Sequence, residues 1–527
     1  VLIPLLAMPL SVSVHDIRTL IEAFHPVIVI ETVEEERVGT LLKQVSQDLH
    51  LALFEWSSSQ GLARSPDSAD NRWVNEYAPP GSSRVQALAD TEEPLDLLKH
   101  IAEMPTKAVF WLKDFAKYFD EPKVVRRFRE LAHDLSYNQS ALVITGDGIS
   151  LPPEVVHDAV QYNLRLPDAD ELFGAVKQTV RSLRGKKQIQ IQLSEDEIKR
   201  LVYALSGMTL KQARQVVAFA AMEDGVLSAE DVQRILDRKA QVIHDEGLLD
   251  YFPPEASDQA IKGFASELGG FTQLKRWLAR AKVGFSEEAR ALNLSPPKGI
   301  LIVGIQGCGK SLAAKAIAQA WQMPLLKLDA GRLYDKYVGE SEKNFRRAIT
   351  LAESMSPTVL WIDEIEKSIG GDSGGGEDGG LSRRLFGSFL TWMQEKSQQV
   401  FVVATANDLS KIPPELLRKG RFDEIFFVDL PDAKERSVIF RIHLMKRKQT
   451  HESLNLTALV EATDGFSGAE IEQAIITALY QALFEKTPLS TNILLQEIKA
   501  TVPLSVSRRE DLQHLRAFAK ERFVSVR

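Results

Sequence analysis

Short apolar runs that end in polar or glycine residues recur in both halves of the chain. They lie within the stretches VIVIE, VFWLK and LVITG of the first half and GILIVG, VLWID and VFVVATA of the second half. Runs of this length and composition predict strands buried on both faces, as in a parallel sheet covered by helices. We therefore expect an α/β fold in both halves, with any ligand at the carboxyl ends of the strands.

The first of these runs continues into an acid-rich turn. Glu31, Glu34, Glu35 and Glu36 follow the apolar residues 27–30 directly. Because this is the end of a strand at which α/β proteins usually bind ligands, the turn raises the question of what such a site would hold.

A strand, a glycine loop and an Ala-rich helix follow one another at 299–321. This context and the spacing of the glycines predict a P-loop, in which backbone N–H groups and the positive end of a helix bind phosphate. Lys310 is expected to reach the β- and γ-phosphates, and the Ser311 hydroxyl to ligate Mg²⁺. The expected ATP-binding residues of this loop are Gly304, Ile305, Gln306, Gly307, Cys308, Gly309, Lys310 and Ser311.

Polar residues follow two further strands of the second half. Asp363 and Glu364 end the run at 358–362, and Asn407 follows the run at 400–406. We expect Asp363 to hold Mg²⁺ through water, Glu364 to act as general base towards the attacking water, and Asn407 to orient that water. The alternative for the two acids is capping of the next helix. Arg418 and Arg421 lie on a segment that is able to project towards a neighbouring subunit.

Residues 255–500 closely resemble the AAA ATPases, in the branch that contains protein-remodelling members. The resemblance rests on ELGG before the first strand, the P-loop, DEIEK, ATAND, GRFD and GFSGAEIEQAI, in this order. It implies that Asn407 is the first sensor residue and that Arg421 is an arginine finger acting in trans within a ring, for which we expect six subunits. It also implies that Gly468 and Ala469 form the lid turn beside the nucleotide.

The sequence departs from the family pattern at two informative positions. Glu424 stands where a second finger arginine is expected, which suggests slow or partner-dependent hydrolysis. Cys308 lies inside the P-loop, where its oxidation or alkylation would block ATP. The alternative, which we favour, is a small residue that fills a tight turn.

A segment at 333–349 resembles the first pore loop of remodelling AAA proteins. Tyr337 and Val338 are then expected to grip an extended polypeptide, and Gly339 to permit the turn. The alternative is a buried aromatic residue that anchors a loop.

The first half resembles a degenerate copy of the second. VFWLKDFAK at 109–117 lies over VLWIDEIEK at 359–367 without a gap, so that Lys113 and Asp114 replace Asp363 and Glu364. LVITGDG at 142–148 mirrors VVATAND at 402–408 and places Asp147 opposite Asn407, and LSGMTLKQARQVV at 205–217 resembles the lid turn and helix at 464–476. Residues 57–83 are a polar insertion, expected to be a loop.

An ungapped overlay of the first strand places Glu31, Glu34 and Glu36 on the three P-loop glycines. Carboxylates would repel phosphate, and a cation at position 113 would repel Mg²⁺. We therefore expect no ATP in this module. The expected organisation is a degenerate AAA-like α/β domain at 1–185, a helical lid-like region at 186–248, a linker at 249–258, the AAA α/β domain at 259–432, and a helical lid with C-terminal helices at 433–527.

Composition narrows the classes of function. A net charge of −8 gives no general reason to bind nucleic acid, a single cysteine suits a reducing compartment, and no run is long enough to span a membrane. We expect an ATP-dependent protein remodeller with one active site per chain, a homo-oligomer that acts on a protein of unknown identity. The alternative is a regulatory scaffold whose ATP state controls partner binding by the N-terminal module. The arrangement of one degenerate and one active module is similar to a poorly characterised AAA family of plastid and cyanobacterial genomes. This resemblance implies a cytosolic or stromal protein with a possible link to photosynthesis.

Overall fold

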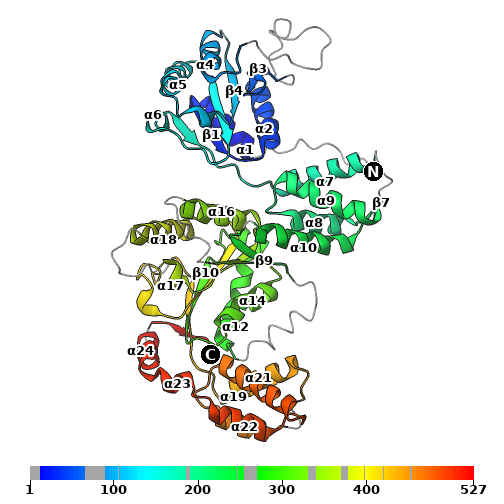
Figure 1. The fold of residues 1–527 in the computed structure, drawn as a ribbon, viewed down its shortest axis with the longest axis vertical. Helices are drawn as coiled ribbons and strands as arrows, with labels where there is room; N and C mark the ends of the chain where they lie inside the picture. The colour runs from blue at the N-terminus through cyan, green and yellow to red at the C-terminus, as the bar shows by residue number, and fades with distance from the viewer. Residues whose placement is uncertain are drawn as a thin grey trace. The chain divides into compact units, whose positions relative to one another are not determined.

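The structure of the chain is a computed structural model. It describes residues 12–65, 90–104, 106–184, 190–245, 247–254, 270–329, 340–369, 378–396, 398–418, 420–450, 454–520 and 522–527. The chain divides into two compact units (Figure 1). The first unit comprises Val1–Pro167 and Thr209–Arg214, and the second comprises Asp168–Met208 and Gln215–Arg527. Each unit contains one large β-sheet.

The sheet of the first unit has the strand order β3-β2-β4-β5-β1-β6. Its strands are β1 (Val27–Glu31), β2 (Ala52–Ser57), β3 (Gly61–Arg64), β4 (Ala108–Lys113), β5 (Ala141–Gly146) and β6 (Ala159–Gln161). All are parallel except the edge strand β3, which forms a hairpin with β2. Part of the segment predicted as a polar loop is therefore a strand, because Leu62 is buried against the core of this sheet.

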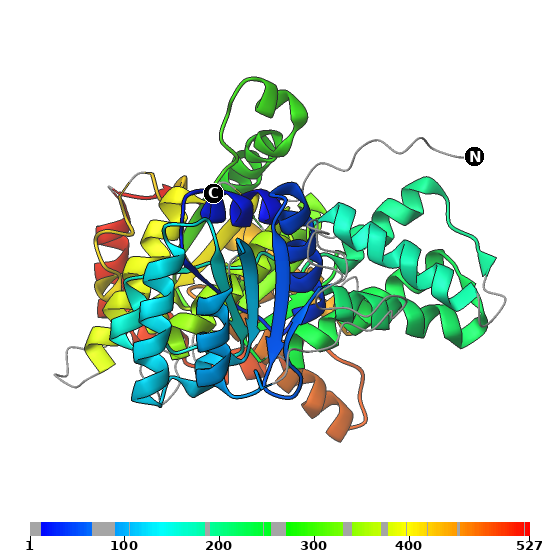
Figure 2. The same ribbon diagram turned by 90° about the horizontal axis from the view of Figure 1, so that it is seen from above.

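Helices cover both faces of this sheet (Figures 1 and 2). On one face, α1 (Val12–Glu22) and α2 (Glu35–Asp48) share a core with β1 and β4. On the other face, α4 (Pro94–Glu103) and α5 (Pro122–Leu135) pack on an aromatic core that includes Phe110 and Phe128. The short η2 (Phe115–Tyr118) and α6 (Pro153–Val156) follow the carboxyl ends of β4 and β5. The first unit is thus a doubly wound α/β domain, as predicted.

A helical region follows the first domain in sequence. It contains α7 (Ala169–Arg184), α8 (Glu195–Leu205), α9 (Leu210–Asp224) and α10 (Ala229–Asp245), with a short ladder between β7 (Gln190–Ile191) and β8 (Val226–Leu227). Helix α8 begins with a capping box between Ser194 and Glu197, which satisfies free N–H groups of the first turn. Apart from Thr209–Arg214, this region groups with the second unit, so α7 lies outside the first compact unit although we expected an α/β domain up to residue 185.

The sheet of the second unit has the order β15-β14-β10-β13-β12-β11-β9. Its strands are β9 (Leu249–Phe252), β10 (Gly299–Gly304), β11 (Leu325–Leu328), β12 (Thr358–Ile362), β13 (Val400–Ala406), β14 (Glu424–Val428) and β15 (Val524–Ser525). Strand β9 is antiparallel to β11. Residues 249–252 were predicted to begin a linker, but they form this edge strand because Leu249 and Tyr251 are buried.

Helices also flank the second sheet. On one face, α12 (Thr272–Ala281) and α14 (Lys310–Trp321) pack on β10 and β13, with η3 (Lys282–Phe285) and α13 (Glu287–Ala291) between them in sequence. Helices α16 (Glu340–Ser354), α17 (Ile365–Ile369) and α18 (Asp378–Glu395) belong to the other side of the sheet in Figure 1. The short η4 (Leu409–Lys411) follows β13.

A helical lid follows β14 and has a core of its own. It is built from α19 (Ala433–Lys446), α20 (Leu456–Ala462), α21 (Gly468–Phe484) and α22 (Thr491–Ala500). Helices α23 (Leu504–Ser507) and α24 (Arg509–Lys520) then lead to β15, which pairs with β14 at the sheet edge. The chain end is therefore not only helical, because Val526 is buried and its carbonyl accepts the N–H groups of Gln273 and Leu274.

The predicted repeat is confirmed by the two sheets. The order β2-β4-β5-β1-β6 of the first corresponds to β11-β12-β13-β10-β14 of the second. The ladders agree residue by residue where the sequences align, since Val109 pairs with Ala141 in one sheet and Val359 with Phe401 in the other. Asp114 and Glu364, which lie one and two residues after their strands, both have a left-handed backbone conformation, with φ of 55° and 49°.

Candidate nucleotide site

The predicted P-loop lies between β10 and α14, at the carboxyl end of its strand. A side chain at Gly304 is excluded, because an added Cβ atom would lie 2.0 Å from the carbonyl oxygen of Val428 on the neighbouring strand. Gly307 has a φ of 77°, which only glycine adopts without strain. The loop of residues 305–309 therefore has the backbone freedom that a phosphate cradle needs.

Lys310 occupies the first position of α14 and points into the loop. Its side chain is buried, and Nζ donates to the carbonyl oxygens of Gly304 and Ile305 at 2.8 Å each. Burial lowers the pKa of Lys310 to about 8, while Cys308 and the carboxylates of Glu366, Asp363 and Glu364 oppose the shift. A buried ammonium with carbonyl partners favours an anionic ligand, since phosphate would supply the missing charge.

Asp363, at the end of β12, brings two hydroxyl groups together. Its Oδ1 accepts from Ser311 Oγ at 3.2 Å and from Thr405 Oγ1 at 2.6 Å. Lys327 Nζ lies 4.0 Å from the other carboxylate oxygen. A carboxylate beside a hydroxyl at the rim of a phosphate loop fits Mg²⁺, which prefers oxygen ligands and takes few of them from the protein. The structure thus brings the predicted ligands Ser311 and Asp363 together.

Glu364 and Asn407 are in direct contact across β12 and β13. Asn407 Nδ2 donates to Glu364 Oε1 at 2.7 Å, and Lys367 forms an ion pair with the other oxygen of the same carboxylate. The Glu364 amide donates to Thr405 Oγ1 at 3.1 Å. The predicted base and the predicted water-orienting residue therefore form one hydrogen-bonded pair.

The lid turn lies against the P-loop, as the resemblance implied. The N–H group of Ala469 donates to the carbonyl oxygen of Gly307 at 3.0 Å. Ser467 caps α21 in a capping box with Glu470, which fixes the start of this helix. An added Cβ atom at Gly468 would lie 3.2 Å from the same carbonyl oxygen, so a small residue is needed there.

Cys308 is buried beneath the loop. Burial raises the pKa of its thiol to about 12, although Lys310 lowers it in part. Because the thiolate is the reactive form, this thiol is poorly nucleophilic at neutral pH. The environment favours the interpretation of Cys308 as a small residue that fills the turn over that of a redox switch.

The remaining predicted residues lie outside this cluster or outside the described part of the chain. Arg421 is partly exposed and donates to the carbonyl oxygen of Glu415 in its own chain. Glu424 begins β14 and its Oε1 accepts from the N–H group of Ile425. The pore-loop residues Tyr337, Val338 and Gly339 lie outside the described residues.

The first unit has a shorter loop at the equivalent position. Three residues, 32–34, separate β1 from α2, whereas five residues, 305–309, separate β10 from α14. The ungapped overlay of the acids on the glycines therefore fails within the loop, because α2 begins at Glu35. Arg37, which that overlay places on Lys310, is buried and donates to the carbonyl oxygen of Arg165 at 2.5 Å.

The carboxylates of this turn have partners inside the first unit. Glu31 Oε1 accepts from the Gly148 N–H group at 3.1 Å, and Glu34 Oε1 accepts from the Leu210 N–H group at 2.8 Å. Glu36 forms an ion pair of 2.9 Å with Arg214. In the repeat, Leu210 corresponds to Ala469. The N–H group at this position donates to the Glu34 carboxylate in the first unit and to the Gly307 carbonyl oxygen in the second.

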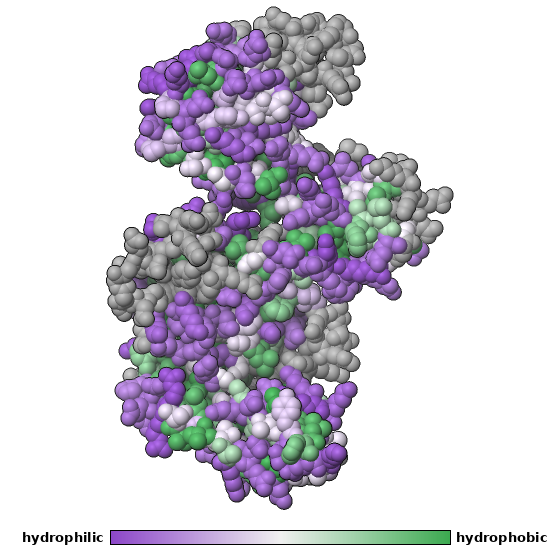
Figure 3. Space-filling model, in the orientation of Figure 1, coloured by the Kyte–Doolittle hydropathy of each residue, from purple (hydrophilic) through white to green (hydrophobic). Residues whose placement is uncertain are grey.

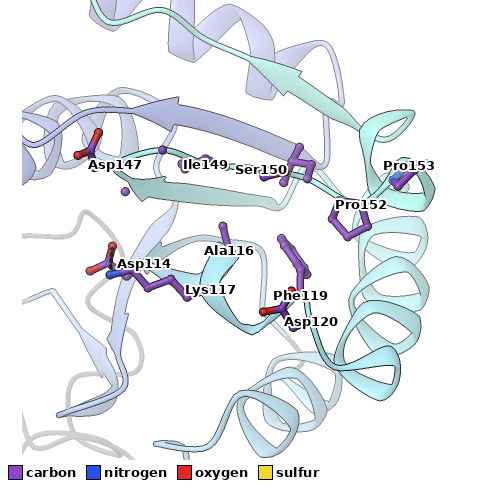
Figure 4. Close-up of a pocket in the computed structure, with 13 residues that line it drawn as sticks. Asp114, Ala116, Lys117, Phe119, Asp120, Asp147, Ile149, Ser150, Pro152 and Pro153 are labelled. Atoms are coloured by element: carbon purple, nitrogen blue, oxygen red, sulfur yellow. Dashed lines mark ion pairs between the residues drawn. The ribbon is translucent and has the colours of Figure 1, made fainter. Parts of the chain in front are cut away.

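The counterparts of the catalytic acids are also engaged differently. Lys113 pairs with Glu55 at 3.3 Å, and Asp114 pairs with Lys117 at 3.1 Å. Behind them lies a cavity of about 370 Å³ between η2 and the loop that follows β5 (Figure 4). No group of His, Cys, Asp or Glu side chains suited to a metal ion occurs among the residues that the structure describes.

The fold, the phosphate loop and the carboxylates at the strand ends define a P-loop ATPase. The model of the ATPase family associated with various cellular activities (AAA) matches residues 300–430, and that of the AAA+ lid domain matches 453–493. The models of the N-terminal and second domains of SpoVK-like AAA ATPases match residues 13–164 and 170–246. The chain belongs to the AAA family and is an ATPase.

Similar proteins extend over nearly the whole chain. The uncharacterized AAA domain-containing protein ycf46 of Guillardia theta is 36% identical over 510 residues, which cover 96% of this chain and 94% of the relative. That of Pyropia yezoensis is 34% identical over 509 residues, with coverages of 96% and 97%. The Cell division cycle protein 48 homolog of Archaeoglobus fulgidus is 36% identical over 211 residues, 39% of this chain and 28% of the relative. No helix in the described ranges is long and apolar enough to cross a membrane.

Sequence reasoning missed two residues of the site. Thr405 bridges Asp363 and the Glu364 amide, and Glu366 accepts the Asn407 N–H group at 2.9 Å. The repeat held a signal for both. Thr405 corresponds to Thr145, so a threonine occurs at this position in both modules. Glu366 corresponds to Ala116, so the acid occurs only in the module with the predicted catalytic residues.

Proposed function

We propose that the chain hydrolyses ATP at one site, in the second unit, and uses the energy to remodel a protein substrate. The observation that carries the proposal is the Glu364–Asn407 pair, which stands beside Asp363 and Ser311 at the carboxyl edge of the sheet. Glu364 takes a proton from water as the oxygen attacks the γ-phosphorus, and ADP leaves with the electrons of the broken P–O bond. Asp363 and Ser311 would hold Mg²⁺, which would neutralise charge on the phosphates.

Glu364→Gln tests the site. The variant should bind ATP but hydrolyse it with a kcat reduced at least 100-fold, because the amide cannot accept the proton of water. Wild-type kcat in this variant would contradict the assignment of the base. Asp464→Asn is a suitable control, since this exposed acid lies in the lid and pairs with Arg436.

We further propose that the active form is a homo-oligomeric ring, with six subunits as the expected number, in which Arg421 serves the neighbouring site. Exposed apolar residues at the end of α21 support an oligomer, because Tyr480, Leu483 and Phe484 are 68% to 85% exposed (Figure 3). Mixing Arg421→Ala with Glu364→Gln chains should restore part of the activity that each lacks alone. No recovery above the sum of the separate variants would argue against action in trans.

Remodelling by threading predicts a separate phenotype for Tyr337. Tyr337→Ala should leave basal hydrolysis intact and abolish unfolding of a tagged protein substrate. The near full-length likeness to ycf46 proteins of algae supports the plastid stroma, or the cytosol of a cyanobacterium, as the site of action.

The second candidate is a nucleotide-dependent scaffold. It is favoured by the first unit, where Glu34 and Glu36 hold the Thr209–Arg214 segment and the described residues show no phosphate cradle. In that case Glu364→Gln with ATP should trap a partner, and Tyr337→Ala should change nothing.

A further inference from the structure

Glu366 is a buried carboxylate beside the catalytic pair. It lies in the first turn of α17 and is 4% exposed. Its Oε1 accepts the main-chain N–H group of Asn407 at 2.9 Å, whereas its Oε2 is buried without a hydrogen-bond partner in the part of the chain that the structure describes. An acid at this position costs free energy that an apolar residue would not.

The electrostatic surroundings of Glu366 act in the same direction. Burial raises the pKa of Glu366, and the charge of Glu364 adds to the shift, whereas the N–H group of Asn407 and the ammonium of Lys310 oppose it. The bond from the Asn407 N–H group is thus the hydrogen bond that this carboxylate is seen to make with another residue in the described part of the chain.

Two hydrogen bonds connect Glu366 with the base. Glu366 holds the backbone of Asn407, and the side-chain amide of Asn407 holds Glu364 at 2.7 Å. Asn407 directly follows the last residue of β13, where no further ladder bond fixes its backbone. The carboxylate of Glu366 therefore replaces the missing strand partner and sets the direction of the amide.

The first unit shows the same place without this acid. Ala116 stands in the position of Glu366 and Asp147 in that of Asn407. Ala116, Asp114 and Asp147 line the cavity of about 370 Å³, in which the short methyl group of Ala116 reaches neither acid (Figure 4). The ionised side chains of Asp114 and Asp147 cannot form the hydrogen bond that Asn407 and Glu364 share. The first unit therefore lacks the counterpart of Glu366 together with the amide that Glu366 holds.

We propose that Glu366 is a positioning residue, whose Oε1 fixes Asn407 so that the amide orients Glu364 towards the attacking water. The inference rests on the proposed function, in which Glu364 is the base.

Three substitutions separate the contact from the charge. Glu366→Ala removes the acceptor, Glu366→Asp keeps the charge but withdraws the oxygen by one methylene, and Glu366→Gln keeps an acceptor without the charge. We expect kcat to fall about 10- to 100-fold in the Ala and Asp variants and KM for ATP to change less than threefold, because displacement of a positioned group affects the chemical step most. Glu366→Gln should retain at least one third of the wild-type kcat. Glu223→Ala and Glu223→Gln are matched controls on α9, where Glu223 is exposed and pairs with Arg234.

A second measurement does not depend on activity. Hydrogen exchange of the peptide that contains Asn407 should become at least tenfold faster in Glu366→Ala and Glu366→Asp but not in Glu366→Gln. Wild-type kcat in Glu366→Ala, or equal loss in the Ala and Gln variants, would overturn the inference. Failure of the wild-type protein to hydrolyse ATP would contradict the proposed function. Unchanged hydrogen exchange in all variants would show, independently of activity, that Glu366 does not hold the Asn407 backbone. Should Glu366→Ala not fold, the comparison of Gln with Asp decides, and equal activity of the two would count against Glu366.

Discussion

The Thr405 hydroxyl group connects the carboxyl ends of β12 and β13. Thr405 Oγ1 donates to Asp363 and accepts the Glu364 amide, so one hydroxyl group orders both acids. In the first unit, the equivalent Thr145 instead accepts the indole N–H group of Trp111 at 2.8 Å. The same residue type therefore serves packing in one module and the active site in the other. The indole nitrogen of Trp361 is correspondingly buried without a partner within the described residues.

Thr405→Val should lower kcat about tenfold or more, because Asp363 loses its shortest hydrogen bond and the Glu364 amide loses its acceptor. Thr405→Ser should restore activity, since the hydroxyl is kept. ATP turnover at saturating ATP measures the effect, and Thr145→Val serves as the control in the first unit. A Thr405→Val protein with wild-type kcat would show that Asp363 is held by other groups.

At the scale of elements, β9 links the helical region to the second sheet. It follows α10 in sequence and pairs with β11, while Tyr203 on α8 donates to the carbonyl oxygen of Pro357 at 3.0 Å. Gly207 has a φ of 82°, and an added Cβ atom would lie 2.6 Å from Met355 Cγ, so α8 and α16 meet through a glycine. The helical region and the ATPase core are thus parts of one compact unit.

Lys239 lies inside this junction. It is 2% exposed, and its ammonium lies 4.9 Å from the ring centre of Tyr251 on β9. Burial lowers the pKa of Lys239 to about 7, so that between pH 7 and its ordinary value the unfolded chain binds more protons than the folded chain. The free energy of unfolding should therefore rise with pH across this window.

Lys239→Met should stabilise the second unit near pH 7 by on the order of 2–4 kcal/mol, because the buried amine is replaced by an apolar chain of similar length. The gain should shrink as pH rises towards 10. Urea unfolding at pH 7 and pH 9 measures both effects, with Lys199→Met as the control at an exposed ion pair. An equal gain at both pH values would mean that Lys239 is not the titrating group.

For the whole molecule, the repeat is one of architecture and not of chemistry. Both sheets share a strand order, but among the described residues a glycine loop with a buried lysine, near the Glu364–Asn407 pair, occurs in the second unit alone. The first unit keeps the framework and fills the loop with acids that its own chain engages.

We expect one nucleotide per chain in isothermal titration with ADP. Lys310→Ala should abolish this binding altogether, because the described residues of the first unit form no second phosphate cradle. Lys113 of the first unit corresponds to Asp363 in the repeat. Lys113→Ala should leave the stoichiometry at one. A stoichiometry of two, or residual binding of one in Lys310→Ala, would place a nucleotide in the first unit.

The sequence predicted that the residues of the candidate site lie together because they belong to short motifs that end neighbouring strands, and their catalytic roles stay predictions. Gly304, Lys310, Asp363 and Asn407 are each fixed within a few residues of a strand end, so motif and geometry coincide. The contacts of Thr405 and Glu366 depend on strand pairing across the sheet, which spacing along the chain does not give. Strand β9 was missed because the prolines at 253 and 254 indicate a linker, whereas its burial depends on β11, more than 70 residues later.

The bond between Glu34 and Leu210 has a consequence for what the protein can sense. In the second unit, the lid turn rests on a loop whose ligand is exchanged with solution, so its state follows the ratio of ATP to ADP. In the first unit, the equivalent turn is held by carboxylates of the same chain, whose local concentration is fixed by covalent connection. We therefore expect the ratio of ATP to ADP to have no direct effect on the first module.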